Sequence, residues 1–327
     1  MYGVLDEQPH RSLLVGLWRR WLPQANSAFM LQRTMTYHAL VLSLLAATGL
    51  IAADGLELPE SIVQDPDTGA LYCSNVGGSQ PTLEAVVAKD GNGFISKITI
   101  TGGVETLKLI PQPGEPPLNG PKGLCIIGTI LWVTDIDRVV AYDLETSKQI
   151  SEFSLADKNV TFANDLVEVD GDLLVTDTAG DQVLQLKGAD RGTITGAEVI
   201  EKGIFGGANG ITTDGKGTIY LATYPVGTMP KAGGMVRAFK FGESLDNRSK
   251  LSLAVGQWDG VAVAPDGTVY ASDWTSAGIW KLAPGGKPEQ IAKDMKGPAD
   301  FCLLKDGSAL LVPEMGASKI TVVSLAK

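Results

Sequence analysis

The sequence predicts an all-β protein, a six-bladed β-propeller, and two observations carry that prediction. The 327-residue chain has 39 glycines and only 6% aromatic residues, which is typical of a large β domain with many tight turns. It also contains six copies of one pattern, an apolar strand, a turn and a second strand. Repeats of about 40 to 50 residues with several strands each indicate a propeller, because six sheets arranged radially bury faces that one sheet exposes.

The six copies can be read directly from the sequence. In chain order they are LPESIVQDPDTGALYCSN (58–75), GPKGLCIIGTILWVTDI (120–136), FANDLVEVDGDLLVTDT (162–178), GGANGITTDGKGTIYLATY (206–224), GQWDGVAVAPDGTVYASDW (256–274) and GPADFCLLKDGSALLVPE (297–314). Alternating strands such as RVVAYDL and GIWKL follow them. The last copy lacks an outermost strand, and we expect the short GLEL at 55–58 to supply it and close the ring.

The N-terminal part differs from the repeats. The run ALVLSLLAATGLIAADG at 39–55 is apolar, too short for a membrane span, and ends in small residues. It predicts a secretory signal with cleavage near residue 53 and export to the periplasm or the medium. Met30 and Met35 are both natural starts. We therefore assign 1–53 to a leader and signal peptide and 54–327 to the propeller, with no membrane span in the mature protein.

Composition excludes several classes of function. The net charge of −10 and pI near 4.8 argue against a nucleic-acid partner. Both histidines, His10 and His38, lie in the predicted leader. The mature protein then lacks the residues for Ser-His-Asp or Cys-His catalysis and for ordinary zinc sites.

The cysteines are odd in number, three in all. Cys125 and Cys302 lie in apolar contexts, GLCII and DFCLL, that are typical of core strands. We expect these two and Cys73 to be buried thiols, and one disulfide is the alternative for an exported protein.

One position of the repeat is polar where a buried strand should be apolar. We call its occupants the ring residues: Glu60, Lys122, Asn164, Asn209, Asp259 and Ala299. Two positions further on, every copy is apolar. Inner strands of a propeller run along the central channel, so the ring residues should meet at one mouth.

Four of the ring residues offer side-chain oxygens and carry two negative charges between them. Such a set suits one hard divalent cation, calcium before magnesium. The alternative is that each is a turn residue, because Asn and Asp before glycine are common in turns. Four occurrences at one equivalent position favour a metal site. We expect the acids that end the second strands, Asp135, Asp177 and Asp273, to make structural loop bonds.

Glu, Asn, Asn and Asp at the heads of inner strands of a six-bladed propeller resemble the senescence marker protein and gluconolactonase family, which is regucalcin-like and related to diisopropylfluorophosphatase. The resemblance covers the whole predicted propeller, although PESI stands where the family usually has Glu-Gly-Pro. It implies a channel-bound divalent ion and hydrolysis of lactones or related esters. It also implies that Glu60, Asn164, Asn209 and Asp259 are metal ligands and that Asp259 is the base or nucleophile.

The remaining candidates surround the ring. Lys122 either faces an anionic substrate or oxyanion, or pairs with Glu60 in the place of a metal, or is a surface lysine. Long loops at 75–93 and 224–235 should wall the site, with Tyr224 and Trp274 as substrate-binding aromatics.

Two functions follow from these residues. The first is a metal-dependent hydrolase of a small-molecule lactone or ester, in which a metal-activated water attacks and Asp259 takes the proton. The alternative is a binding or scaffold propeller without chemistry, in which Lys122 neutralises the ring.

Overall fold

The computed structural model describes residues 55–203, 205–226, 233–242, 251, 253 and 256–325. The predicted leader and the boundary after residue 53 lie outside the described residues. Within the described part, no helix combines the length and apolar character needed to cross a membrane.

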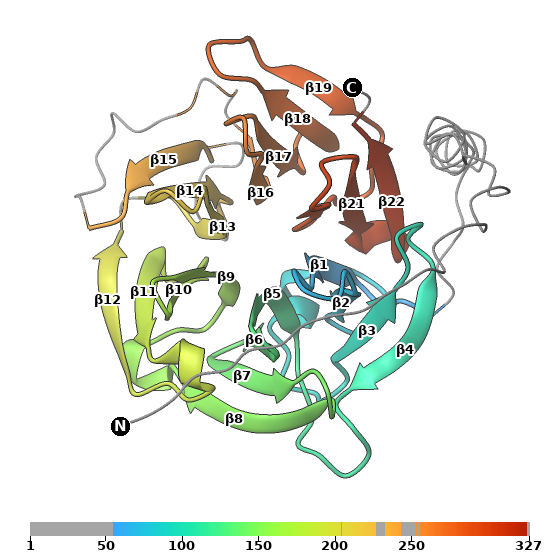
Figure 1. Ribbon diagram of the computed structural model, residues 1–327, viewed down its shortest axis with the longest axis vertical. Helices are drawn as coiled ribbons and strands as arrows, with labels where there is room; N and C mark the ends of the chain where they lie inside the picture. The colour runs from blue at the N-terminus through green and yellow to red at the C-terminus, as the bar shows by residue number, and fades with distance from the viewer. Residues whose placement is uncertain are drawn as a thin grey trace, which may run out of the picture. The chain divides into compact units, whose positions relative to one another are not determined.

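The described chain is all-β and folds into six antiparallel sheets arranged radially about one axis (Figure 1). Each sheet is one blade, and its strands follow the chain order from the axis outward. The first blade consists of β1 (Pro59–Gln64), β2 (Leu71–Asn75), β3 (Phe94–Ile98) and β4 (Val104–Ile110). The second consists of β5 (Pro121–Ile127), β6 (Ile130–Asp135), β7 (Arg138–Asp143) and β8 (Lys148–Ser154). The third consists of β9 (Ala163–Val169), β10 (Asp172–Asp177), β11 (Gln182–Lys187) and β12 (Gly196–Lys202). The fourth blade consists of β13 (Ala208–Thr213), β14 (Thr218–Thr223) and β15 (Val236–Lys240). The fifth consists of β16 (Trp258–Val263), β17 (Val269–Asp273), β18 (Gly278–Leu282) and β19 (Glu289–Ala292). The sixth consists of β20 (Cys302–Leu303), β21 (Ala309–Glu314) and β22 (Lys319–Ser324). The predicted six-bladed propeller is confirmed.

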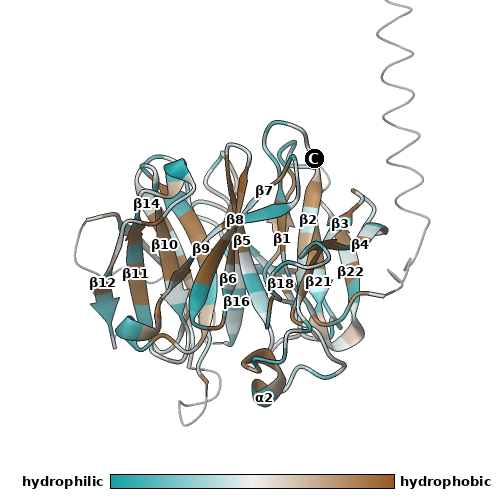
Figure 2. Ribbon diagram, turned by 90° about the horizontal axis from the view of Figure 1, so that it is seen from below, coloured by the Kyte–Doolittle hydropathy of each residue, from teal (hydrophilic) through white to brown (hydrophobic). Residues whose placement is uncertain are grey.

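In the described residues, helical structure is confined to short turns between strands. They are α2 (Leu83–Val86) and the 3-10 turns η1 (Ala156–Lys158), η2 (Ala189–Arg191) and η4 (Met315–Ala317). In the side view, α2 stands out from one face of the ring of blades (Figure 2).

The hydrophobic core lies between blades. Each junction of neighbouring blades has its own cluster of buried apolar residues; Trp132 of the second blade, for example, packs with Leu184 of the third. Successive side chains of a strand point to opposite faces, and both faces of each sheet meet a neighbouring blade. Strands such as β6 are therefore apolar in a continuous run, with Leu131 and Val133 in the cluster on one face and Trp132 in the cluster on the other. The six apolar residues two positions after the ring residues are all buried, as predicted.

The ring closes differently from the sequence-based expectation. The segment 55–58 forms no strand on the sixth blade, which has three strands in the described part of the chain. Instead, Leu56 is buried between the first and last blades, and Val76 N–H donates to Leu58 O at 3.1 Å, so the segment follows the first blade. The prediction for GLEL is wrong because Leu56 fills the junction instead of extending a sheet.

The three cysteines lie in three different blades and are free. Cys73 and Cys302 are buried, as predicted, whereas Cys125 is half-buried on β5. Burial raises the pKa of the Cys125 thiol to about 12.

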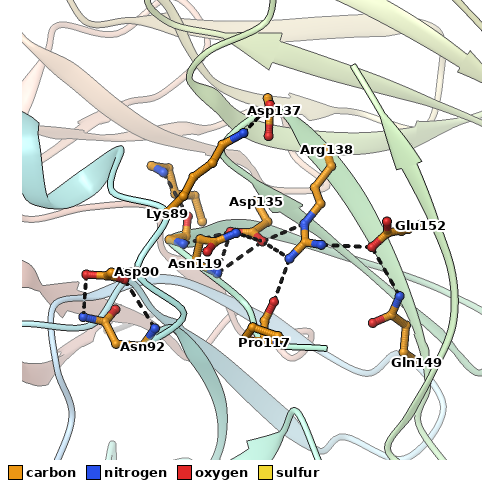
Figure 3. A network of polar contacts seen from close by, with 12 residues as sticks. Lys89, Asp90, Asn92, Pro117, Asn119, Asp135, Asp137, Arg138, Gln149 and Glu152 are labelled. Atoms are coloured by element: carbon orange, nitrogen blue, oxygen red, sulfur yellow. Dashed lines mark hydrogen bonds and ion pairs between the residues drawn. The ribbon is translucent and has the colours of Figure 1, made fainter. Parts of the chain in front are cut away.

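The acids that end the second strands bond to the loops that precede the inner strands. Asp135 accepts hydrogen bonds from Asn119 N at 3.0 Å and Gly120 N at 2.8 Å and from the guanidinium of Arg138 (Figure 3). Asp177 accepts from Phe162 N, and Asp273 from Gln257 N. The prediction that these acids are structural is confirmed, and each bond fixes the approach to a ring residue.

Candidate functional site

The ring residues meet in one cavity of about 240 Å³. Five of them line it: Glu60, Lys122, Asn164, Asn209 and Asp259. Each of the five is buried, with at most 5% of its surface exposed. Ala299 is not part of the lining and packs with Leu58 and Met315 beside it. The structure therefore brings together every predicted metal ligand.

A β-bulge turns each of these side chains toward the channel. In five blades, the ring residue and the residue after it lie opposite a single residue of the second strand: 60–61 opposite 74, 122–123 opposite 134, 164–165 opposite 176, 209–210 opposite 222 and 259–260 opposite 272. A bulge leaves the extra residue out of the ladder and re-aims its side chain. This explains how a polar residue can open a buried strand.

Hydroxyl side chains opposite the bulges hold the displaced backbone. They accept hydrogen bonds from bulged N–H groups, Ser74 from Ser61, Thr176 from Asp165 and Ser272 from Gly260. They also donate to the ring-residue carbonyls of the next blade, Thr134 to Asn164 at 2.6 Å, Thr176 to Asn209 at 2.6 Å and Ser272 to Ala299 at 3.0 Å. Neighbouring blades are thus tied at the level of the ring, which preorganises it.

The glycine that follows a ring residue allows neighbouring inner strands to pack closely against each other. A Cβ on Gly210 would lie 2.1 Å from the carbonyl oxygen of Asp259, and one on Gly260 would lie 2.7 Å from Asp300 Cα. Neither glycine has positive φ. The Asn-Gly and Asp-Gly pairs are therefore packing features of the ring rather than turns.

Each predicted metal ligand presents one buried oxygen without a hydrogen-bond partner. These atoms are Glu60 Oε2, Asn164 Oδ1, Asn209 Oδ1 and Asp259 Oδ1. A turn residue bonds its side chain to the local main chain, and these oxygens do not. Leaving a buried acceptor unpaired costs about 1–3 kcal/mol, and one positively charged ligand would satisfy all four oxygens at once. Carboxylate and amide oxygens are the donors that calcium and magnesium accept, and the residues fit such a cation.

Asp259 is positioned by the two predicted aromatics. Trp274 Nε1 donates to Asp259 Oδ2 at 2.8 Å. Tyr224 packs edge-on against the Trp274 ring, with centroids 5.7 Å apart and planes at 88°. The hydrogen bond holds Oδ2 of Asp259 and leaves Oδ1 without a partner, as one of the four unpaired oxygens of the ring residues.

The channel concentrates buried carboxyl groups. Burial, and then the charge of Asp300, raise the pKa of Asp259 to about 8, while the Trp274 hydrogen bond opposes the shift. Burial, followed by the charge of Asp259, also raises the pKa of Glu60. A bound cation would reverse both shifts because it favours the charged carboxylates.

Lys122 is buried, with 1% of its surface exposed, so the surface-lysine alternative is wrong. Its Nζ donates to Gly120 O at 2.9 Å and lies 4.8 Å from the centre of the Phe162 ring. Burial lowers the pKa of Lys122 to about 8, and the charges of Glu60 and Asp135 oppose the shift. The amine is held at the wall of the cavity that the four predicted metal ligands also line.

Sequence reasoning missed two acids directly below the ring. Asp165 and Asp300 follow ring residues and line a second cavity, of about 470 Å³, further along the inner strands. Asp165 accepts from Ile211 N at 2.7 Å, and Asp300 accepts from the Ser61 hydroxyl at 2.6 Å. The signal was present, because the other residues at this repeat position are serine or glycine.

The predicted loops wall the cavity. Pro81, Leu83 and Val86 come from the first loop, and Pro225 and Val226 from the second. The stretch 227–232 of the second loop lies outside the described residues.

No known protein-family model matches this chain, and no curated protein matches it. Solved structures do share its fold. A gluconolactonase from Xanthomonas campestris is 15% identical, with a TM-score of 0.58 over 84% of this chain and 88% of that one. A 6-phosphogluconolactonase-like protein from Bacteroides uniformis is 16% identical, with a TM-score of 0.52 over 82% and 81%.

Virginiamycin B lyase from Staphylococcus aureus is 15% identical to this chain, with a TM-score of 0.51 over 85% of this chain and 98% of that one. At such identities the likeness shows the fold. The fold is that of a propeller shared with lactonases and a lyase, which is consistent with the resemblance to gluconolactonases.

Proposed function

We propose that this protein is a divalent-cation-dependent hydrolase of a lactone or related ester, with Asp259 as the proton acceptor. The observation that carries the proposal is the convergence of four buried, unpartnered oxygens in one cavity. The propeller fold shared with a gluconolactonase supports a hydrolase that acts on a small molecule.

In this proposal Glu60, Asn164, Asn209 and Asp259 hold the cation, with calcium preferred. A cation at this position would polarise the ester carbonyl and lower the pKa of water. The two asparagines fix the geometry without adding charge, and the hydroxyls behind them keep their backbones in place.

Asp259 then acts as a general base. Water adds its oxygen to the carbonyl carbon of the lactone or ester and gives a proton to Asp259. The bond between that carbon and the leaving alkoxide oxygen then breaks, and the proton passes from Asp259 to this oxygen. Trp274 keeps the carboxylate oriented through Oδ2. Lys122 then donates a hydrogen bond to the oxyanion that forms at the carbonyl.

The experiment that tests the proposal compares hydrolysis of a lactone panel by wild type and Asp259→Asn with saturating calcium. We expect the variant to lose at least about 100-fold in kcat. Asp157→Asn is the matched control, because this exposed acid lies on η1 away from the cavity and should keep full activity. A variant with wild-type activity would refute the base assignment, and a wild type that hydrolyses no lactone would favour the binding propeller.

A further inference from the structure

We infer that the site takes a lactone or ester with an apolar tail and discriminates against polyhydroxylated sugar lactones. This inference rests on the proposed function, since it names the substrate class of the same site. It is carried by the distribution of polar and apolar groups along the cavity, by the exposed Leu83 at its rim and by the aromatic pair at its wall.

Most polar side chains of the cavity lining belong to the ring residues. Five ring residues supply charged and amide groups, and the other side chains with a polar atom in the described lining are Gln257, Tyr224 and Trp274. The other walls are apolar: Pro81, Leu83, Val86, Pro225, Val226 and Met315. A sugar lactone has a hydroxyl on nearly every carbon, and a buried hydroxyl without a partner opposes binding. These walls offer such hydroxyls almost no partners.

The indole of Trp274 has no N–H left to donate to a ligand. Trp274 Nε1 already donates to Asp259, and the indole ring lies against Gly297, where an added Cβ would come within 2.9 Å of the ring. Tyr224 packs against the same ring. The indole is therefore held in place, and its N–H is already used by Asp259.

The rim carries an apolar side chain that the protein itself leaves uncovered. Leu83 is 54% exposed and is one of four exposed large hydrophobic residues in the described part of the chain. The other three, Ile100, Ile150 and Val199, are absent from this cavity lining. The Thr82 hydroxyl accepts a hydrogen bond from Ala85 N and caps the turn that displays Leu83. An apolar group held in water at a cavity mouth suits an apolar ligand.

The test measures kcat/KM, with saturating calcium, for δ-gluconolactone and for δ-lactones carrying no, three-carbon or five-carbon side chains. We expect kcat/KM to rise about fourfold per methylene that enters the cavity. The five-carbon lactone should exceed gluconolactone by more than about 100-fold.

Leu83→Ser should cut kcat/KM for the five-carbon lactone by about tenfold and leave the unsubstituted lactone nearly unchanged. Ile150→Ser is the matched control, because Ile150 is 48% exposed on β8 and should change neither rate. A preference for gluconolactone, or rates independent of chain length, would overturn the inference while leaving the hydrolase intact.

Failure of the proposed function has a different signature, which is no hydrolysis of any lactone. In that case tryptophan fluorescence titration with the same compounds decides the substrate preference. Tighter binding of the five-carbon lactone than of gluconolactone supports the apolar cavity, and equal or weaker binding overturns it.

Discussion

Replacing Asp259 with asparagine should affect the protein with and without calcium in opposite directions. Without calcium, the variant removes one carboxylate from a channel in which Glu60, Asp165 and Asp300 are also buried. We therefore expect metal-free Asp259→Asn to be at least as stable as metal-free wild type. With calcium, the variant lacks one ligand charge and should gain little.

The size of the calcium effect follows from mass action. A ligand at a hundredfold excess over its dissociation constant stabilises the folded state by about 2.7 kcal/mol. With an unfolding entropy of about 2.1 cal/mol/K per residue, a domain as long as residues 55–325 should gain roughly 5 °C in Tm. Wild type should show this shift, and Asp259→Asn should show less than about half of it.

The pH dependence of the metal-free protein has a defined sign. Burial holds the pKa of Asp259 at about 8 in the folded state, above its usual value of 3.8. The folded state therefore binds a proton more tightly, and the stability from this group is present at low pH and is lost as the pH rises toward about 8. In chelator, the Tm of wild type should fall more between pH 5 and 8 than that of Asp259→Asn.

The assay is thermal unfolding followed by circular dichroism, in chelator and in excess calcium. Asp300→Asn is the matched control: it removes a buried carboxylate from the same channel, but Asp300 Oδ2 bonds to Ser61 and is not one of the four unpartnered oxygens. It should keep the calcium shift. Equal calcium shifts in wild type and Asp259→Asn, or none in wild type, would refute the reasoning.

Three further predictions concern the fold and its processing. Asp135→Ala should lower the free energy of unfolding by about 3–5 kcal/mol, because it removes the acceptor of the Asn119 and Gly120 N–H groups and one of the two acidic partners of Arg138 (Figure 3). Asp137→Ala breaks only the exposed pair with Lys89 and should cost less than about 1 kcal/mol. Urea denaturation compares the two variants, and equal losses would contradict the assignment. All three thiols should be titratable in the denatured, unreduced protein and protected in the native one; fewer than three in the denatured protein would reveal a disulfide. Export should remove the leader near residue 53, and an intact N-terminus on protein recovered from its natural cells would contradict this.

The convergence of the ring residues could be predicted because they occupy the same position in each repeat. Once six equivalent strands surround one axis, residues at the same repeat position must meet, so Asn164 and Asn209 could be placed together from spacing alone. The structure adds the reason that they face inward, since Thr134 and Thr176 secure bulges that strand periodicity does not reveal.

Other features depend on contacts that strand patterning does not encode. Leu56 was expected in an edge strand, but a short apolar segment fills a junction between blades equally well. Trp274 follows the end of β17, which lies beside the start of β16 in the antiparallel pair, so the repeat places it near Asp259. Strand patterning does not encode the side-chain orientation by which the indole Nε1 donates to Asp259 Oδ2. Asp300 was not predicted as a channel residue because the ring position of its repeat is Ala299, which has no polar side chain.

The most direct measurement is a calcium titration of hydrolysis by chelator-treated protein, together with the metal content of the protein as purified. We predict about one divalent cation per chain, loss of lactone hydrolysis in chelator, and recovery that saturates at one equivalent of tightly bound calcium. A protein that contains no divalent metal and hydrolyses lactones equally well in chelator, or hydrolyses none in saturating calcium, would contradict the proposed metal-dependent hydrolase.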